Sequence, residues 1–225
     1  MAEDNSLILY EDPQILVCHK PPGLAVQSAR MGSMDLESVL KNYLAAKGSG
    51  RIPYLGVVHR LDQPVEGLVV FAKTPAAAKS LSAQAAGDGM KKYYLAVSAH
   101  IPEKKEGVLE HMLFKDGRSH MARVAAPEEK GAKRAVLFYR LLKEVKGLGL
   151  FEIRLETGRF HQIRVQMAAA GMPLAGDKKY NLGECEKGWQ ELGLCAYRLQ
   201  FTHPKTKKSM KFEITPKGRA FEHLI

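Results

Sequence analysis

Short apolar runs of strand length follow one another along most of this 225-residue chain, and turn residues such as Pro, Gly and Asp separate them. The runs are rich in Val, Ile, Leu, Tyr and Phe, which is typical of β-strands. We predict strands at 7–10, 14–19, 57–59, 68–73, 93–99, 107–113, 134–142, 150–156, 194–202 and 209–215, the last two forming a hairpin. Because strands outnumber helices and short turns join most of them, we expect an α+β fold with a largely antiparallel mixed sheet flanked by helices.

Three segments have helical rather than strand-like spacing: 34–46, 75–86 and 160–170. Ser33 is the candidate N-cap of the first helix. Thr74 and Pro75 have the residue types of an N-cap and a first helical position, and Gly87 can end the helix that they begin. Gly171 stands where the third helix should end.

A chain of this length suits a single domain, with a core from about residue 7 to residue 217 and no internal repeat. The longest apolar runs are far too short to span a membrane, and the acidic start does not resemble a signal peptide. The three cysteines, Cys18, Cys185 and Cys195, are too few and too scattered for a disulfide framework. We therefore expect a soluble, cytoplasmic protein with reduced thiols and no membrane contact.

The charge balance is strongly basic. Thirty-four Lys and Arg residues against 24 Asp and Glu residues give a net charge of +10. Such a surplus favours a polyanionic partner, because each neutralised phosphate releases condensed counterions. A soluble basic protein without such a partner is the alternative on charge alone.

Several catalytic signatures are absent from the sequence. We find no phosphate-binding GxxxxGK[ST], no GxGxxG after a strand, no HExxH and no GxSxG. The eight histidines have no metal-ligand spacing. If the chain is an enzyme, it is expected to work with side chains alone, without a cofactor or a metal.

The first chemical motif is HRLDQPVEG at 59–67, in which Asp62 lies in a short connection between two apolar strands. Loops held by rigid strands are common places for catalytic groups. The alternative is that Asp62 only caps a turn.

The second motif is TGRFHQIRV at 157–165. Arg159, His161, Gln162 and Arg164 gather near the start of the predicted third helix, an end that already favours anions. Pairing of Arg164 with a surface carboxylate is the simpler alternative.

The third motif is KKYYLAV at 91–97, where lysines precede two tyrosines at the start of a strand. Such a combination can hold a phosphate backbone and stack a base. Tyrosine packing alone would explain the same pattern.

Together these segments resemble the RluA-type family of RNA pseudouridine synthases. HRLD at 59–62, KYYLAV at 92–97 and TGRFHQIR at 157–164 are similar to the family's motifs in this order, and weaker echoes extend the resemblance over about 10–215. The resemblance implies the family's catalytic fold and a structured RNA substrate, either ribosomal or transfer RNA. It also implies no cofactor, and we expect a monomer.

The resemblance assigns roles residue by residue. Asp62 would be the catalytic nucleophile, Arg164 its ion-pair partner, Tyr94 the ring that stacks on the target base, and Arg60 the side chain that fills the gap left by the flipped base. Further candidate RNA contacts are His59, Lys20, Lys73, Lys92, Arg159, His161 and Gln162, with Lys91, Arg118, Arg123, Lys178 and Lys179 as additional cations for phosphates. Since many relatives carry a small N-terminal RNA-binding domain and this chain reaches the first motifs within about ten residues, we expect none here.

The chain departs from the family pattern at three positions. Val65-Glu66 replaces the usual pair of hydroxyl residues, Gln166 stands where histidine is common, and Val136 stands where threonine is common. Glu66 should add a negative charge near the RNA path, which bears on substrate contacts more than on the reaction.

Two other functions remain open. A nucleic-acid glycosidase would cleave the base and release it, although such enzymes commonly use a carboxylate pair and only Glu66 lies near Asp62 in sequence. A non-catalytic RNA-binding protein is the other alternative, which the presence of Asp62, Tyr94 and Arg164 disfavours.

Overall fold

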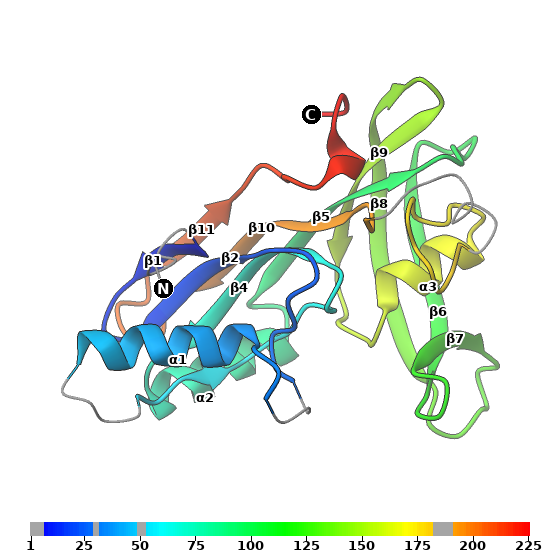
Figure 1. The fold of residues 1–225 in the computed structure, drawn as a ribbon. Coiled ribbons are helices and arrows are strands. Elements are labelled where there is room, and N and C mark those ends of the chain that lie inside the picture. The colour runs from blue at the N-terminus through cyan, green and yellow to red at the C-terminus, as the bar shows by residue number, and fades with distance from the viewer. Residues whose placement is uncertain (1–6, 29–31, 49–52, 182–190) are drawn as a thin grey trace. The chain divides into compact units, whose positions relative to one another are not determined.

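The computed structural model describes residues 7–28, 32–48, 53–181 and 191–225. These residues contain eleven β-strands and three α-helices (Figure 1), which confirms the α+β prediction. The chain divides into two compact units, Met1–Lys91 with Ala196–Ile214, and Lys92–Cys195 with Thr215–Ile225. A single domain stays a prediction, and each unit is described in turn.

The first unit contains the sheet order β1–β2–β4–β10, with β11 paired to β10 and β3 paired to β4. The pairs β1–β2, β2–β4, β3–β4 and β10–β11 are all antiparallel. The strands are β1 (Ile8–Glu11), β2 (Ile15–Lys20), β3 (Gly56–Val57), β4 (Glu66–Ala72), β10 (Leu194–Thr202) and β11 (Ser209–Glu213). The predicted final hairpin is confirmed.

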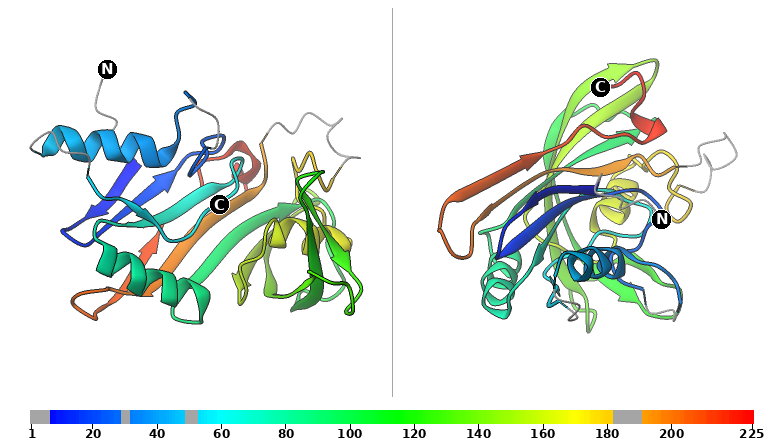
Figure 2. Two further views of the ribbon diagram at one scale, coloured as in Figure 1. Left: turned by 90° about the horizontal axis from the view of Figure 1, so that it is seen from below. Right: turned by 60° about the vertical axis from the view of Figure 1, so that its left-hand side comes forward.

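Two helices accompany these strands, α1 (Leu36–Lys47) and α2 (Pro75–Ala86). In the left view of Figure 2, strands β1 and β2 lie between them. Thr74 caps α2 as predicted, since its Oγ1 accepts the amide of Ala77. The predicted cap Ser33 is wrong, because the side chain that accepts the Ser38 amide belongs to Asp35.

Strand β4 is buried along its whole length. Side chains on one of its faces, Leu68 and Val70, pack in one core with Ala77 and Leu81 of α2. A strand covered on both faces reads as a continuous apolar run, which is why 68–72 could be predicted. Because β4 is fixed in this way, the loop that enters it has a rigid end.

The second unit has the strand order β5–β9–β8–β6–β7, with antiparallel pairing throughout. Its strands are β5 (Lys91–Ser98), β6 (Glu106–Asp116), β7 (Met121–Ala125), β8 (Lys133–Val145) and β9 (Leu148–Leu155). The sequence prediction missed β7. Only Ala122 of this strand is fully buried, so its apolar pattern is weak.

Helix α3 (Gln162–Ala169) packs in this unit through Val165, which joins a core of Leu113, Ala122 and Ala135. Figure 1 shows α3 beside β6 and β7. Gly171 follows the helix with a φ of +76°, which agrees with its predicted terminal position.

Cys18 and Cys195 are both buried, and Cys185 lies outside the described residues. None of the helices found in the described ranges is long and apolar enough to cross a membrane.

Candidate active site

Asp62 lies in the loop that leads into β4. The amide of Val65 donates to the Asp62 carbonyl over 3.0 Å, which closes a tight turn. The flanking side chains of Leu61 and Val65 are buried, whereas Asp62 is half-buried. The apolar neighbours therefore anchor the loop on both sides of the half-buried Asp62.

Lys20 holds this loop from inside. Its side chain is fully buried, and its ammonium donates to the carbonyl oxygens of Pro21, Leu24 and Gln63 over 2.8, 2.7 and 3.0 Å. Gly23 and Gln63 add two bonds between the same segments. Two donors of Lys20 thus hold the turn that follows β2, and the third joins this turn to the residue after Asp62. Lys20 lies in the interior rather than at the surface, where we expected a phosphate contact.

The charge of Lys20 is balanced by two carboxylates. Burial lowers the pKa of Lys20 to about 8, while the negative charges of Asp62 and Glu66 act to raise it. Lys20 is therefore still mainly protonated at pH 7. Its positive charge favours the ionised form of Asp62, which a nucleophilic role requires.

Glu66 does not add an exposed charge. It is only 3% exposed, and its carboxylate lies 2.7 Å from Nε2 of His19. Its charge therefore lies inside the protein beside His19 of β2 rather than on the surface, and an effect of Glu66 on RNA binding stays a prediction. Gly67 beside it has a φ of +141°, and a Cβ there would come within 2.6 Å of the Ala196 backbone. Only glycine fits this place.

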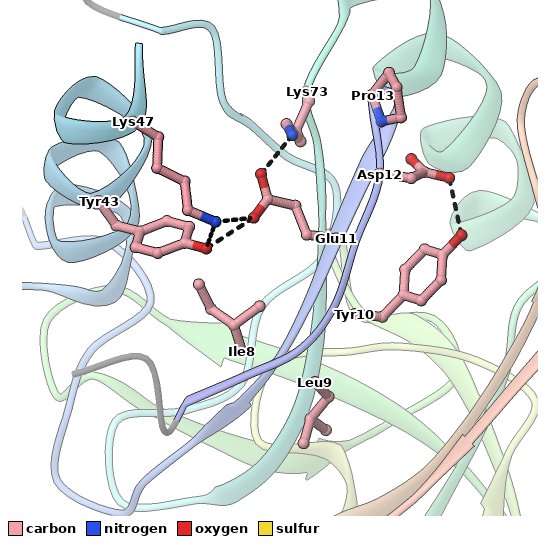
Figure 3. Close-up of a pocket in the computed structure, with 9 residues that line it drawn as sticks. All are labelled: Ile8, Leu9, Tyr10, Glu11, Asp12, Pro13, Tyr43, Lys47 and Lys73. Carbon is pink, nitrogen blue, oxygen red and sulfur yellow. Dashed lines mark hydrogen bonds and ion pairs between the residues drawn. The ribbon is translucent and has the colours of Figure 1, made fainter. Parts of the chain in front are cut away.

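Three other predicted RNA contacts of the first unit lie in or near the 59–67 motif. His59 accepts the Val70 amide through Nε2 at 3.1 Å, so it braces the loop against β4. Arg60 is exposed. Lys73 donates to Glu11 over 2.7 Å, at the edge of a groove of about 560 Å³ formed mainly by β1 (Figure 3). Asp62 is not among the residues that line this groove.

In the second unit, Lys92 and Tyr94 lie on β5, opposite Leu155 and Ile153 of β9. Since they are two residues apart, their side chains project from the same face of the strand. Tyr94 is only 7% exposed. Burial lowers the pKa of Lys92. Tyr94 is therefore mostly covered by neighbouring residues, and its role as the ring that stacks on the base stays a prediction.

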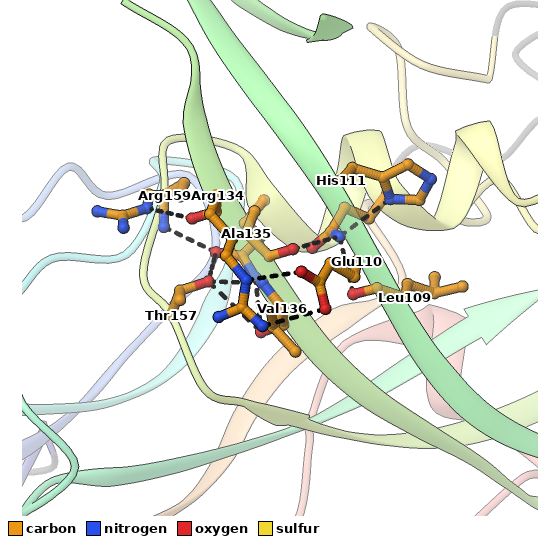
Figure 4. Close-up of polar contacts among 10 residues, drawn as sticks. Leu109, Glu110, His111, Arg134, Ala135, Val136, Thr157 and Arg159 are labelled. Atoms are coloured by element: carbon orange, nitrogen blue, oxygen red, sulfur yellow. Dashed lines mark hydrogen bonds and ion pairs between the residues drawn. The ribbon is translucent and has the colours of Figure 1, made fainter. Parts of the chain in front are cut away.

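The loop before α3 is organised by Gln162. Its Oε1 accepts from the Thr157 hydroxyl at 2.8 Å and from the Arg159 amide at 2.9 Å, while its Nε2 donates to the Val136 carbonyl at 3.0 Å. Figure 4 shows Thr157, Arg159 and Val136 together. Nε of Arg159 also donates to the Arg134 carbonyl. Gln162 is buried and shapes this loop, although the sequence suggested an RNA contact.

His161 lies in the same segment and is also buried. The Tyr180 hydroxyl forms a hydrogen bond of 2.8 Å with Nδ1 of His161, and its oxygen also accepts the Ala122 amide. The ring of His161 stacks on Phe160 with 3.8 Å between centroids. Burial, and then the positive charge of Arg164, lower the pKa of His161 to about 3. His161 is therefore neutral at physiological pH.

Arg164 forms a buried ion pair with Asp177, a residue that the sequence analysis did not select. Nε and Nη2 of Arg164 donate to Oδ2 and Oδ1 of Asp177 over 2.8 and 2.6 Å. Asp62 belongs to the first unit, whereas Arg164 and Tyr94 belong to the second. Their convergence stays a prediction. One of the weaker similarities to the family pattern, the segment 171–177, ends at Asp177.

Across the portions of the chain that the structure describes, no three His, Cys, Asp or Glu side chains lie close enough together to hold an ion.

Comparison with known proteins gives a consistent family match. The model of the RNA pseudouridylate synthase family matches residues 14–169. A relative described as an uncharacterised RNA pseudouridine synthase, from Zymomonas mobilis, is 37% identical over 174 residues, covering 77% of each chain.

Two further relatives are described as ribosomal large subunit pseudouridine synthase D. The one from Zymomonas mobilis is 35% identical over 219 residues, which are 92% of this chain and 68% of the relative. The one from Neisseria meningitidis serogroup A is 37% identical over 218 residues, which are 92% of this chain and 57% of the relative.

Solved structures agree on the fold. Human RNA pseudouridylate synthase domain containing 4 has a TM-score of 0.76 at 23% identity, covering 93% of this chain and 88% of the other. Human RNA pseudouridylate synthase domain containing 1 has a TM-score of 0.77 at 21% identity, covering 96% and 85%. At these identities the likeness concerns the fold alone.

Proposed function

The chain belongs to the RNA pseudouridylate synthase family, and we propose that it isomerises uridine in ribosomal RNA with Asp62 as its nucleophile. The observation that carries the proposal is the clamped loop of the first unit, in which Lys20 holds the residue after Asp62 through a 3.0 Å bond. A half-buried carboxylate with a fixed backbone and a buried cation nearby suits nucleophilic attack. Ribosomal RNA is favoured because two similar proteins carry the name of ribosomal large-subunit enzymes.

The reaction rearranges bonds without adding or removing atoms. The N1–C1′ bond of the target uridine breaks, the uracil turns, and C5 joins C1′ while its proton is lost and N1 regains one. Asp62 would act either by attacking C1′ or by removing a ribose proton to give a glycal. Both routes need an ionised carboxylate and neither consumes a co-reactant.

The other roles follow from the chemistry of the side chains. Extrusion of a base from its stack costs a few kcal/mol, and Arg60, which is exposed, would fill the space that the base leaves. Tyr94 would stack on the uracil, a contact worth about 1–3 kcal/mol, and would assist proton removal at C5. The guanidinium of Arg164 would keep Asp62 ionised and directed at the sugar.

A deletion strain complemented with variants tests this proposal. Pseudouridines are mapped in ribosomal and transfer RNA after complementation with wild type, Asp62→Ala or Asp88→Ala. Asp88 is an exposed aspartate in the same unit and serves as the matched control. We expect one ribosomal site to be restored by wild type and Asp88→Ala but not by Asp62→Ala, although Asp62→Ala still binds the RNA.

Three other results would redirect the proposal. Restoration by Asp62→Ala would remove Asp62 from catalysis. A lost site in transfer RNA would change the substrate and keep the reaction. Release of free uracil by the purified protein would favour the glycosidase.

A further inference from the structure

We infer that Asp177 is a positioning residue that sets the direction of the Arg164 guanidinium, an inference that rests on the proposed role of Arg164. The Asp177 side chain is fully buried and that of Arg164 is 5% exposed. Both bonds between them leave the same Nε–Nη2 edge of the guanidinium, at 2.8 and 2.6 Å. Two parallel bonds fix the plane of the fork as well as its distance.

The carboxylate of Asp177 is itself held in place. Its Oδ1 also accepts the backbone amides of Lys179 at 2.9 Å and Tyr180 at 3.2 Å. The Asp177 carbonyl accepts the amide of Asn181, and the side chain of Asn181 donates to the carbonyl of Leu174. The carboxylate is therefore part of a closed turn rather than a side chain that follows Arg164.

The Tyr180 ring restricts Arg164 from a second direction. The guanidinium carbon lies 5.2 Å from the centre of this ring, within the range of a cation–π contact. The Tyr180 hydroxyl is in turn fixed between Ala122 and His161. The segment 177–180 thus contacts the guanidinium both at its Nε–Nη2 edge and on its planar face.

This arrangement matters for the proposed reaction because a guanidinium has five N–H donors in a rigid fork. The contact with Asp177 uses two of them, so the same group can engage a second carboxylate at the same time. Asp177 would determine where that second carboxylate must lie. If Asp177 only stabilised the fold, it would not need to orient the Arg164 guanidinium. The two roles of Asp177 therefore predict different effects of an Asp177 substitution on Arg164.

The experiment compares Asp177→Asn with a matched control, Glu110→Gln. Glu110 accepts two similar hydrogen bonds from Arg134 at 2.6 and 3.0 Å, but both of these side chains are exposed to solvent. We expect Asp177→Asn to lower kcat about 100-fold, the effect of a small misplacement of a reacting group, with KM changed less than about threefold. Glu110→Gln should retain the activity of wild type.

A double-mutant cycle identifies the residue through which Asp177 acts. Arg164→Lys removes the fork, so adding Asp177→Asn to it should lower kcat by less than about threefold more. If Asp177→Asn lowers kcat by the same factor with Lys at position 164, the inference fails. If Asp177→Asn does not fold, Asp177→Glu, which keeps the charge and displaces the carboxylate, takes its place with the same expected results.

A substrate-free measurement separates this inference from the proposed function. In wild type, the side-chain Nε–H of Arg164 should give an NMR signal protected from solvent exchange, identified by its loss in Arg164→Lys. That signal should lose its protection in Asp177→Asn and keep it in Glu110→Gln. Protection retained in Asp177→Asn overturns the inference, whereas activity retained by Asp62→Ala overturns the proposed function alone.

Discussion

The ammonium of Lys20 lies 3.0 Å from the carbonyl oxygen of Gln63, the residue that directly follows Asp62. The contact joins the end of β2 to the loop that enters β4, 43 residues further along the chain. It is made inside the protein by a lysine with no exposed surface. Buried cations are rare because their desolvation is costly, so one that remains is usually paired with specific acceptors.

Lys20→Met should therefore destabilise the protein. The substitution keeps the bulk of the side chain but removes the Lys20 donor from the carbonyl oxygens of Pro21 and Leu24 and one of two donors from that of Gln63. We expect the free energy of unfolding to fall by about 3 kcal/mol at pH 7. Chemical denaturation of wild type and variant measures this difference. Lys79→Met, at an exposed position of α2, should change the free energy by less than about 0.5 kcal/mol. Equal effects of the two substitutions would contradict the role given to Lys20.

The contribution of Lys20 should also depend on pH. Its pKa is lowered from 10.5 to about 8 by burial, so between these values the unfolded chain binds the proton more tightly than the folded one. Stability must then rise as the pH increases through this window, by up to about 3 kcal/mol. Denaturation at pH 7.5, 9 and 10.5 should show wild type gaining stability relative to Lys20→Met. A constant difference would mean that Lys20 keeps an ordinary pKa.

His161 predicts sensitivity to acid. Burial, with the positive charge of Arg164, lowers its pKa from 6.5 to about 3, so below pH 6.5 the unfolded chain takes up a proton that the folded chain refuses. Stability is complete above pH 6.5 and is lost as the pH falls toward 3. Between pH 7 and pH 5 this loss should be about 1 kcal/mol once solvent screening is allowed for.

Thermal unfolding across this range measures the effect. His161→Gln, which keeps a side chain able to form a hydrogen bond with Tyr180, should flatten the pH dependence, while His100→Gln at an exposed position should leave it unchanged. An unchanged acid slope in His161→Gln would assign the loss of stability to other groups.

Glu66→Gln tests whether the buried carboxylate of Glu66 affects stability or RNA binding. Because Glu66 is buried against His19, its loss should lower stability by about 1–2 kcal/mol and leave RNA affinity within about twofold of wild type. Affinity measured at two salt concentrations distinguishes this from a surface charge, whose removal would strengthen RNA binding most at low salt. Stronger binding with unchanged stability would restore the original expectation.

The sequence could predict which segments form strands because their burial leaves continuous apolar runs. β4 is the clearest case, since all seven of its residues are buried. β7 was missed for the opposite reason, because only Ala122 of its five residues is fully buried. Burial therefore helps strand prediction but does not decide it, because β1 and β11 were predicted although neither contains a buried residue.

The candidate site, too, could be predicted only in part. The types and order of Asp62, Tyr94 and Arg164 could be read from the motifs, but the direction of the charged side chains could not. Lys20 and Gln162 looked like RNA contacts, yet both are buried and donate to main-chain carbonyls. A polar residue in a motif has the same letter whether it points to a ligand or holds a loop. The hydrogen-bond acceptors around the side chain, which only the structure shows, distinguish the two roles.

The N-cap of α1 is another case in which the sequence offered two candidate side chains and the structure shows which one forms the bond. Ser33 and Asp35 are both favourable N-cap types two residues apart, and the choice between them depends on where the helical backbone begins. In the structure, Oδ1 of Asp35 accepts the Ser38 amide at 2.8 Å and Oδ2 accepts the Ser28 amide at 2.6 Å. Asp35→Ala should therefore lower the free energy of unfolding by about 1–2 kcal/mol, whereas Ser33→Ala should change it by less than about 0.5 kcal/mol. Urea denaturation of the two variants measures this, and a larger loss in Ser33→Ala would move the start of the helix back to the position first predicted.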